Sequence, residues 1–280
     1  MLSDKRYFFS GNAVGLGAGF DPCGDEATDL NTCFEGSAAL PPSGGCLQST
    51  APGREIRHPK HGLILSFESS FASAKGEVPD QAAKHPRVEL KSSLTKLKVE
   101  ENGVEIERLA SHIQAEDPRN PDNHDDRGEV IFSHLDEPVI YGIKIGGRAL
   151  TIEFDKYLVA VPTQRELIQQ FKHSHAFRRE YKDRFFSSRE SDEDEIPLVR
   201  GFVATTIVKN ISFGDDRLDK DMIQGVNRVV LPNFGSIFFG ELYIGANSRY
   251  LSLLRLELKS NCTGHLEACY CSLPDPNPTP

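Results

Sequence analysis

The sequence predicts a mainly β protein, an antiparallel β-sandwich or flattened barrel with a short helical insertion near residues 163–186. Strand-turn-strand units recur at residues 94–115, 139–154 and 235–258, and connections of this length favour a sandwich or jelly-roll-like arrangement. The last of these units is apolar on both faces, which is typical of a strand pair that is covered on both sides. Helical periodicity is found in the insertion, so the rest of the chain is assigned to strands and turns.

The N-terminal part of the chain reads as strands separated by polar segments. A first strand is predicted over residues 7–20. Residues 21–56 are rich in Gly, Pro, Ser and Asp and lack periodicity, so they are predicted to form a long loop excursion. Alternation predicts a strand over residues 63–71, and the Asn-Gly pair within residues 94–115 is the preferred turn of a two-stranded hairpin.

The middle of the chain carries the helical insertion. Thr163 and Glu166 form a capping-box pattern at its start. Two apolar stripes at helical spacing follow, and Ser174 between them predicts a bend with a new helix cap. The stripes consist of Leu167, Ile168 and Phe171, and of Phe177, Tyr181 and Phe185.

The hairpin over residues 235–258 has the clearest register. Its tip, Gly-Ala-Asn-Ser at residues 245–248, suits a tight turn because Gly and Asn tolerate positive φ. If Ile244 pairs with Arg249, strict alternation assigns every side chain to a face. One face then carries Ile237, Phe239, Tyr243, Leu254, Leu256 and Leu258, and the other carries Phe238, Leu242, Leu251 and Leu253. Residues 1–273 are thus predicted to form a single β-rich domain, and residues 274–280 a flexible, proline-rich tail.

The composition and the charge exclude some classes of function. The net charge is −9 and the pI is about 5.5, which argues against nucleic-acid binding because that needs a basic face. No window approaches the roughly 20 apolar residues of a membrane span. The first 20 residues lack the continuous apolar run of a secretory signal. The sequence therefore favours a cytoplasmic location, with secretion left as the alternative.

Four potential ligands near the C-terminus suggest a structural zinc site. Cys262, His265, Cys269 and Cys271 lie within ten residues, and thiolates and imidazole are the ligands that zinc prefers. With four protein ligands the ion would have no open position, so its role would be structural. A disulfide between Cys262 and Cys269, or reduced thiols, are the alternatives.

Three further patterns are candidates for chemistry. Asp122, His124 and Asp126 could hold a cation through oxygen and nitrogen ligands, although Arg127 stands where a calcium loop of the EF-hand type needs glycine. His173 and His175 could contribute to a catalytic metal if the bend between the helices brings them together.

Glu241 is the third candidate. In the register given above it points to the apolar face opposite Ser252, where burial would raise the pKa of the carboxyl and suit it to acid–base work. A register slip of one residue would turn it outward instead.

The order of motifs between Ser92 and Leu258 resembles that of the bacterial choice-of-anchor P family. The shared features are a Ser-rich approach to a short strand at residues 92–97, Gly-Ile-x-Ile-Gly-Gly at residues 142–147, Leu-Pro-Asn-Phe-Gly at residues 231–235 and a Leu-rich strand at residues 251–258. This resemblance implies a β-rich secreted module, and it supplies no catalytic residues.

Taken together, the sequence favours a non-enzymatic structural or binding β-module. Its expected partners are proteins, including further copies of itself as a homo-oligomer, because edge strands and Phe-rich surfaces invite pairing. The alternative is a metal-dependent hydrolase or lyase that uses His173 or His175 together with loop carboxylates.

Overall fold

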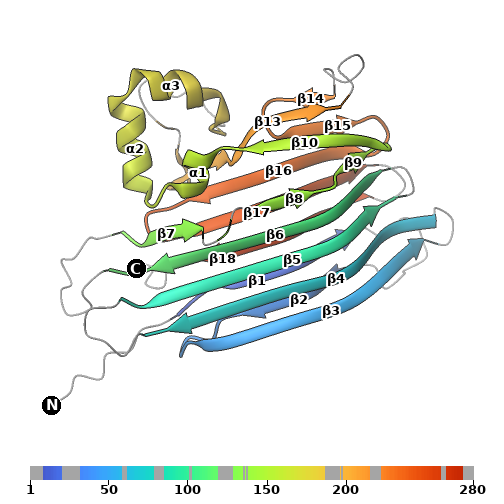
Figure 1. Cartoon of the computed structure of the whole chain (residues 1–280), viewed down its shortest axis with the longest axis horizontal. Helices are drawn as coiled ribbons and strands as arrows, with labels where there is room; N and C mark the ends of the chain where they lie inside the picture. Colours follow the sequence, from blue (N-terminus) through green and yellow to red (C-terminus); the bar gives the residue numbers. More distant parts are fainter. Residues whose placement is uncertain are drawn as a thin grey trace.

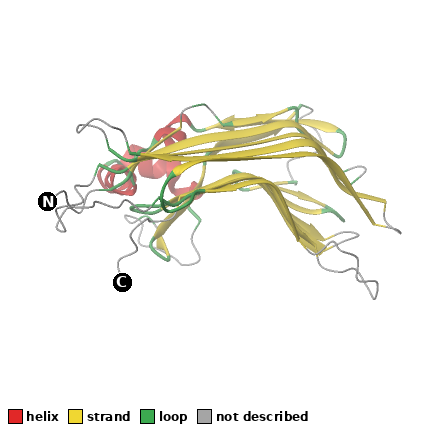
Figure 2. Cartoon of the chain, turned by 90° about the horizontal axis from the view of Figure 1, so that it is seen from below, coloured by secondary structure: helices red, strands yellow, loops and turns green. Residues whose placement is uncertain are grey.

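A computed structural model of the chain shows two antiparallel sheets packed face to face, with the helices at one end of the sandwich (Figures 1 and 2). The mainly β prediction is thereby confirmed. The structure describes residues 9–20, 32–58, 62–78, 85–100, 103–118, 129–134, 136, 138–186, 196, 198–214, 222–259 and 263–273.

The first sheet contains the Leu-rich hairpin near its centre. Its main path, in spatial order, is β11 (Leu198–Val199), β12 (Phe202–Thr206), β16 (Gly235–Ile244), β17 (Arg249–Lys259), β18 (Thr263–Leu273), β1 (Asn12–Phe20) and β2 (Thr32–Ala39). Two short strands extend it beside β16, namely β15 (Arg228–Leu231) and β14 (Ile223–Gln224).

The second sheet is built from longer meandering strands. Its main path is β13 (Val208–Phe213), β10 (Arg148–Phe154), β9 (Lys144–Ile145), β6 (Val104–Glu116), β5 (Arg87–Val99), β4 (Gly62–Glu77) and β3 (Gly45–His58). The short strands β7 (Ile131–His134) and β8 (Val139–Tyr141) also pair with β6. Buried side chains from both sheets and from the helices form one continuous hydrophobic core.

The helical insertion forms where the capping pattern predicts it. The elements are α1 (Lys156–Ala160), α2 (Gln164–His173), α3 (His175–Tyr181) and the 3₁₀ turn η1 (Lys182–Arg184). The Thr163 hydroxyl accepts a hydrogen bond from the Glu166 amide, and the Ser174 hydroxyl accepts one from the Phe177 amide. The predicted bend and cap at Ser174 are confirmed, whereas α1 was not predicted. No helix in the described part of the chain is long and apolar enough to cross a membrane.

The predicted hairpin register is confirmed, because Ile244 pairs with Arg249 and Glu241 with Ser252. The assignment of side chains to faces is nevertheless wrong in part. Strand β16 buries Ile237 and Phe239 at odd positions but Leu242 and Ile244 at even positions. The phase of the alternation therefore changes at Gly240, which adopts a φ of +58°.

This change of phase is shared by the long strands of both sheets. Between neighbouring long strands, at least one pair of facing residues is missing from the ladder. These unpaired positions lie side by side on a line across each sheet. A residue with positive φ stands at this level in alternate strands of the first sheet and in β5 of the second sheet, which bends a strand and re-aims its side chains. The positive-φ positions are Gly36, Cys269 and Gly240 in the first sheet and Lys96 in the second. Strict period-two reasoning is thus valid on each side of this line but not across it.

The predicted loop over residues 21–56 is wrong for its described part, because β2 and β3 lie within it. Both are edge strands of their sheets, and β3 buries only Ala51 and Ile56 among its described side chains. Such a strand can contain proline, here Pro52, and shows little apolar alternation. Residues 21–31 and the predicted tail at 274–280 lie outside the described residues.

A close approach between the two sheets at Gly36 gives a stability prediction. A Cβ atom there would lie 2.7 Å from the Ser70 backbone carbon, and φ is +61°. We expect Gly36→Ala to lower the free energy of unfolding by about 1–3 kcal/mol, measured by chemical denaturation. Gly147→Ala is the matched control, since φ is +77° there but no atom lies within 4 Å. Equal losses in the two variants would contradict the close approach.

Candidate functional site

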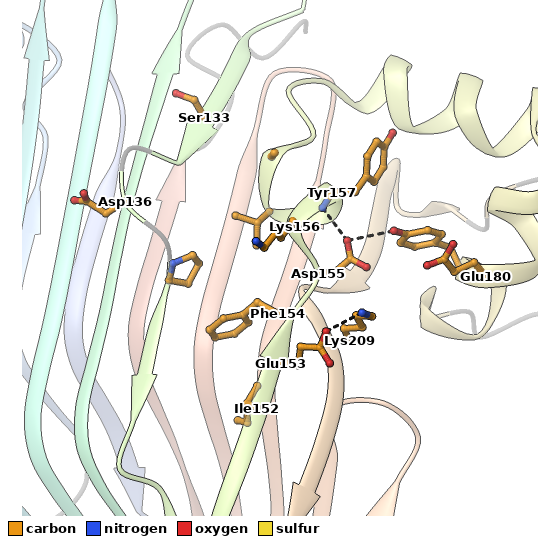
Figure 3. Close-up of a pocket in the computed structure, with 14 residues that line it drawn as sticks. Ser133, Asp136, Ile152, Glu153, Phe154, Asp155, Lys156, Tyr157, Glu180 and Lys209 are labelled. Atoms are coloured by element: carbon orange, nitrogen blue, oxygen red, sulfur yellow. Dashed lines mark hydrogen bonds and ion pairs between the residues drawn. The ribbon is translucent and has the colours of Figure 1, made fainter.

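A pocket of about 840 Å³ opens beside the helical insertion on the second sheet (Figure 3). Ser133 and Asp136 lie on one side of it, and residues of β10 and α1 on the other. Its apolar wall comes from Pro138, Ile152, Phe154, Tyr157, Val159, Ala160 and Tyr181, and its ionisable groups are Asp136, Glu153, Asp155, Lys156, Glu180 and Lys209. A volume and mixed lining of this kind are typical of binding sites.

The pocket exists because two strands of one sheet diverge. Strand β10 pairs with β9 at Arg148 and Ala149, and the Leu150 amide donates to the Ile143 carbonyl at 3.0 Å. Beyond Leu150 no ladder joins β10 to β8 in the described part of the chain, although β8 remains paired with β6. The pocket-lining residues Pro138, Ile152 and Phe154 stand at this split.

Asp155 anchors the pocket wall at the junction of sheet and helices. Its carboxylate caps α1 by accepting hydrogen bonds from the Tyr157 and Leu158 amides at 2.9 and 3.0 Å. It also pairs with Arg184 and accepts a hydrogen bond from the Tyr181 hydroxyl at 3.2 Å. Asp155 and Arg184 are both almost fully buried. This carboxylate is therefore committed to holding the helical insertion on the sheet.

Aromatic rings pack around this anchor. Tyr181 stacks on Phe177 with ring centroids 4.1 Å apart, and the Arg184 guanidinium lies 4.8 Å from the centre of the Tyr181 ring. Burial, with a further contribution from Glu166 and Asp155, raises the pKa of Tyr157 to about 12. Burial and Asp155 raise the pKa of Tyr181 as well. Both phenols therefore stay protonated. The Tyr181 hydroxyl donates to Asp155, whereas the Tyr157 hydroxyl is buried without a partner in the described part of the chain.

The charged rim of the pocket is largely paired. Glu153 and Lys209 form an exposed ion pair at 2.7 Å. Asp136 lies 2.6 Å from His112 Nδ1, and the other ring nitrogen of His112 lies 2.7 Å from Glu89. The hydrogen bond from His112 lowers the pKa of Asp136. His112 thus holds Asp136, which lines one wall of the pocket, against the body of the sheet.

A buried arginine lies near the same end of the sandwich. Arg249 is 1% exposed, donates from Nη1 to the Val161 carbonyl at 2.9 Å and lies over the Phe132 ring at 4.4 Å. Its Nε and Nη2 atoms have no partner in the described part of the chain. Burial lowers the pKa of Arg249 to about 9. The sequence predicted that Arg249 pairs with Ile244, but it did not indicate that its side chain is buried.

The predicted zinc site does not assemble from its described residues. Cys269 and Cys271 are fully buried, whereas His265 is exposed on the opposite face of β18. The Cys271 thiol lies 3.7 Å from the Ser92 hydroxyl inside the sandwich. Burial raises the pKa of Cys271 to about 11 and that of Cys269 well above its ordinary value. Cys262 lies outside the described residues, and no cluster of three metal ligands occurs within them.

The other predicted residues are likewise not brought together. His173 and His175 are both exposed, and His175 Nδ1 lies 2.6 Å from the Arg178 guanidinium. Asp122, His124 and Asp126 lie outside the described residues.

Glu241 is buried, but not on the apolar face. It forms two hydrogen bonds with Arg255, at 2.6 and 2.9 Å, because the change of phase at Gly240 turns it to the outer face of the first sheet. The prediction of an apolar environment for its carboxyl is therefore wrong.

The pocket itself was not predicted, because it depends on strands that are adjacent in space and on a helix far along the chain. One sequence signal could have indicated its anchor. Asp155 directly follows the strand at 150–154, and an aspartate in that position is a favoured N-cap for a helix. That cap would have located α1 and with it one wall of the pocket.

Comparison with known proteins gives a family but no activity. No curated protein and no solved structure matches the chain. The family model described as a domain of unknown function (DUF8256) matches residues 7–245, which include the pocket, the second sheet, the helical insertion and the first sheet except for β17 and β18. The chain therefore belongs to the DUF8256 family.

Proposed function

We propose that the protein is a non-enzymatic binding module that holds a segment of a partner protein in the pocket between β8, β10 and the helical insertion. The observation that carries this proposal is the composition of the pocket. It combines an apolar wall with a charged rim, and its central carboxylate, Asp155, is neutralised by Arg184 rather than available for chemistry. An apolar wall and a charged rim can bind a partner, and the neutralised Asp155 supplies no free acid or base. We therefore favour recognition over catalysis.

A protein partner fits the position of the pocket. The pocket is set between two strands and opens to the surface, so a loop or an extended segment can enter it. Ile152 and Phe154 offer apolar contact, while Lys156 and Glu180 at the rim are exposed. Apolar anchors surrounded by polar groups are the usual anatomy of a protein interface.

Site-specific photo-crosslinking tests this proposal in cells of the source organism. We expect a photoreactive phenylalanine analogue placed at Phe154 to form a covalent adduct with one partner. The matched control places the analogue at Leu47, which is 46% exposed on β3 at the opposite edge of the same sheet. The absence of an adduct from position 154, or the same adduct from position 47, would contradict the proposal. An adduct with the mass of two chains would identify the partner as a second copy.

A further inference from the structure

We infer that the split between β8 and β10 accepts an extended segment of a partner protein as an inserted β-strand, hydrogen-bonded to β10. This inference rests on the proposed function, since it names how the same pocket would hold its partner. The inference depends mainly on the directions in which the backbone N–H and C=O groups of β10 point, and less on the side chains.

The alternation of hydrogen bonds along β10 can be followed residue by residue. The Gly214 amide donates to the Ala149 carbonyl, and the Asp155 amide donates to the Ile207 carbonyl. Odd-numbered residues of β10 therefore direct their backbone groups toward β13. The Leu150 amide points the other way, to Ile143. It follows that Ile152 and Phe154 direct their amides into the split.

These backbone groups lack a ladder partner in the part of the chain that the structure describes. The irregularity in the β10–β13 pairing falls at Lys209 of β13, because Glu153 pairs with Asn210 and Phe154 with Val208. Strand β10 itself therefore stays regular from Leu150 to Phe154. An unpaired edge of this kind is a template for a further strand.

The pocket supplies the room and the side-chain contacts that such a strand needs. Unpaired backbone edges, a pocket of about 840 Å³ and an apolar wall coincide at Ile152 and Phe154. A fitting segment would alternate apolar residues, directed to Ile152, Phe154 and Pro138, with polar residues directed to solvent. The rim groups Lys156 and Glu180 form no ion pair among the described residues, so each can meet an opposite charge on the segment.

The probe for this inference is a phage-displayed library of nine-residue peptides, selected on the full-length protein. We expect the selected peptides to share a period-two apolar pattern. In the synthetic form of the tightest peptide, N-methylation of one alternate set of amides should weaken binding at least tenfold, because it removes the backbone donors that face β10. Amide exchange of Ile152 and Phe154 should slow when the peptide is bound.

Variants of the protein test the hydrogen bonds between the peptide and β10 by changing the β10 backbone instead of the peptide. Ile152→Pro removes the amide that points into the split and should weaken peptide binding, whereas Ile152→Val keeps that amide and should bind normally. If Ile152→Pro does not fold, the N-methylated peptide still decides the question. Failure to select any peptide, protection of amides outside β10, or no effect of N-methylation would overturn strand insertion. The crosslink at Phe154 would be unaffected by these results, so the proposed function is judged separately.

Discussion

Replacing Asp155 with alanine should lower the free energy of unfolding by about 3–5 kcal/mol, because it leaves the Arg184 guanidinium buried without its counter-charge. The variant also loses the two hydrogen bonds that cap α1 and the one from the Tyr181 hydroxyl. Equilibrium denaturation in urea, followed by tyrosine fluorescence, measures the loss. We expect the helical insertion to come away from the sheet before the sandwich unfolds.

Three further variants test whether the loss comes from the buried charge. Glu153→Gln removes a carboxylate two residues away, but its pair with Lys209 is about half exposed, so the change should stay within about 0.5 kcal/mol. Asp155→Asn keeps a capping oxygen and removes the charge. Adding Arg184→Met to Asp155→Asn should recover most of the loss, since no buried charge is then left unpaired. A loss below about 1 kcal/mol in Asp155→Ala would show that Asp155 does not anchor the insertion.

The second large effect has the opposite sign. Arg249→Met should raise the free energy of unfolding at pH 7 by about 1–4 kcal/mol, because methionine removes a buried charge that has no counter-ion in the described part of the chain. The variant loses one hydrogen bond to Val161, which offsets about 1 kcal/mol of the gain. Arg255→Met is the matched control. It should destabilise the fold, because it leaves the buried Glu241 carboxylate without its partner.

The pH dependence of this effect follows from the lowered pKa of Arg249. Between the folded pKa of about 9 and the higher, ordinary pKa of arginine, the unfolded state binds more protons than the folded state. The free energy of unfolding of the wild-type protein therefore increases as the pH rises through that range, because Arg249 loses its buried charge. The stability advantage of Arg249→Met should be complete below pH 9 and shrink above it, as measured by urea denaturation of both proteins. An advantage that does not change with pH would contradict a buried, charged Arg249 at pH 7.

Much of the fold could be predicted because its signals are local. The hairpin at 235–258 specifies its own turn and its own register, and the helical insertion specifies its own caps at Thr163 and Ser174. The edge strands β2 and β3 were missed because few of their side chains are buried, so they lack apolar alternation. The change of phase at Gly240 was missed because it is set by close packing between sheets and by pairing with neighbouring strands.

The candidate site could not be predicted for a related reason. Its walls come from β10, from Asp136 and Pro138 before β8, and from α3, and no local sequence pattern shows that these parts meet. The residues that sequence reasoning singled out, such as Cys271 and Glu241, turned out to be buried structural groups. Residue type and spacing identified side chains that are capable of catalysis or metal binding. The pocket, however, is formed by the divergence of two strands, which residue type and spacing do not reveal.

Residue-resolved amide exchange along β10 tests the central claim most directly, since the account requires an open split at the pocket. In the free protein, the Thr151 and Glu153 amides should exchange slowly because they face β13, while those of Ile152 and Phe154 should exchange at least a hundredfold faster. Slow exchange at all four positions would show that the split is closed, and it would contradict the site proposed for partner binding.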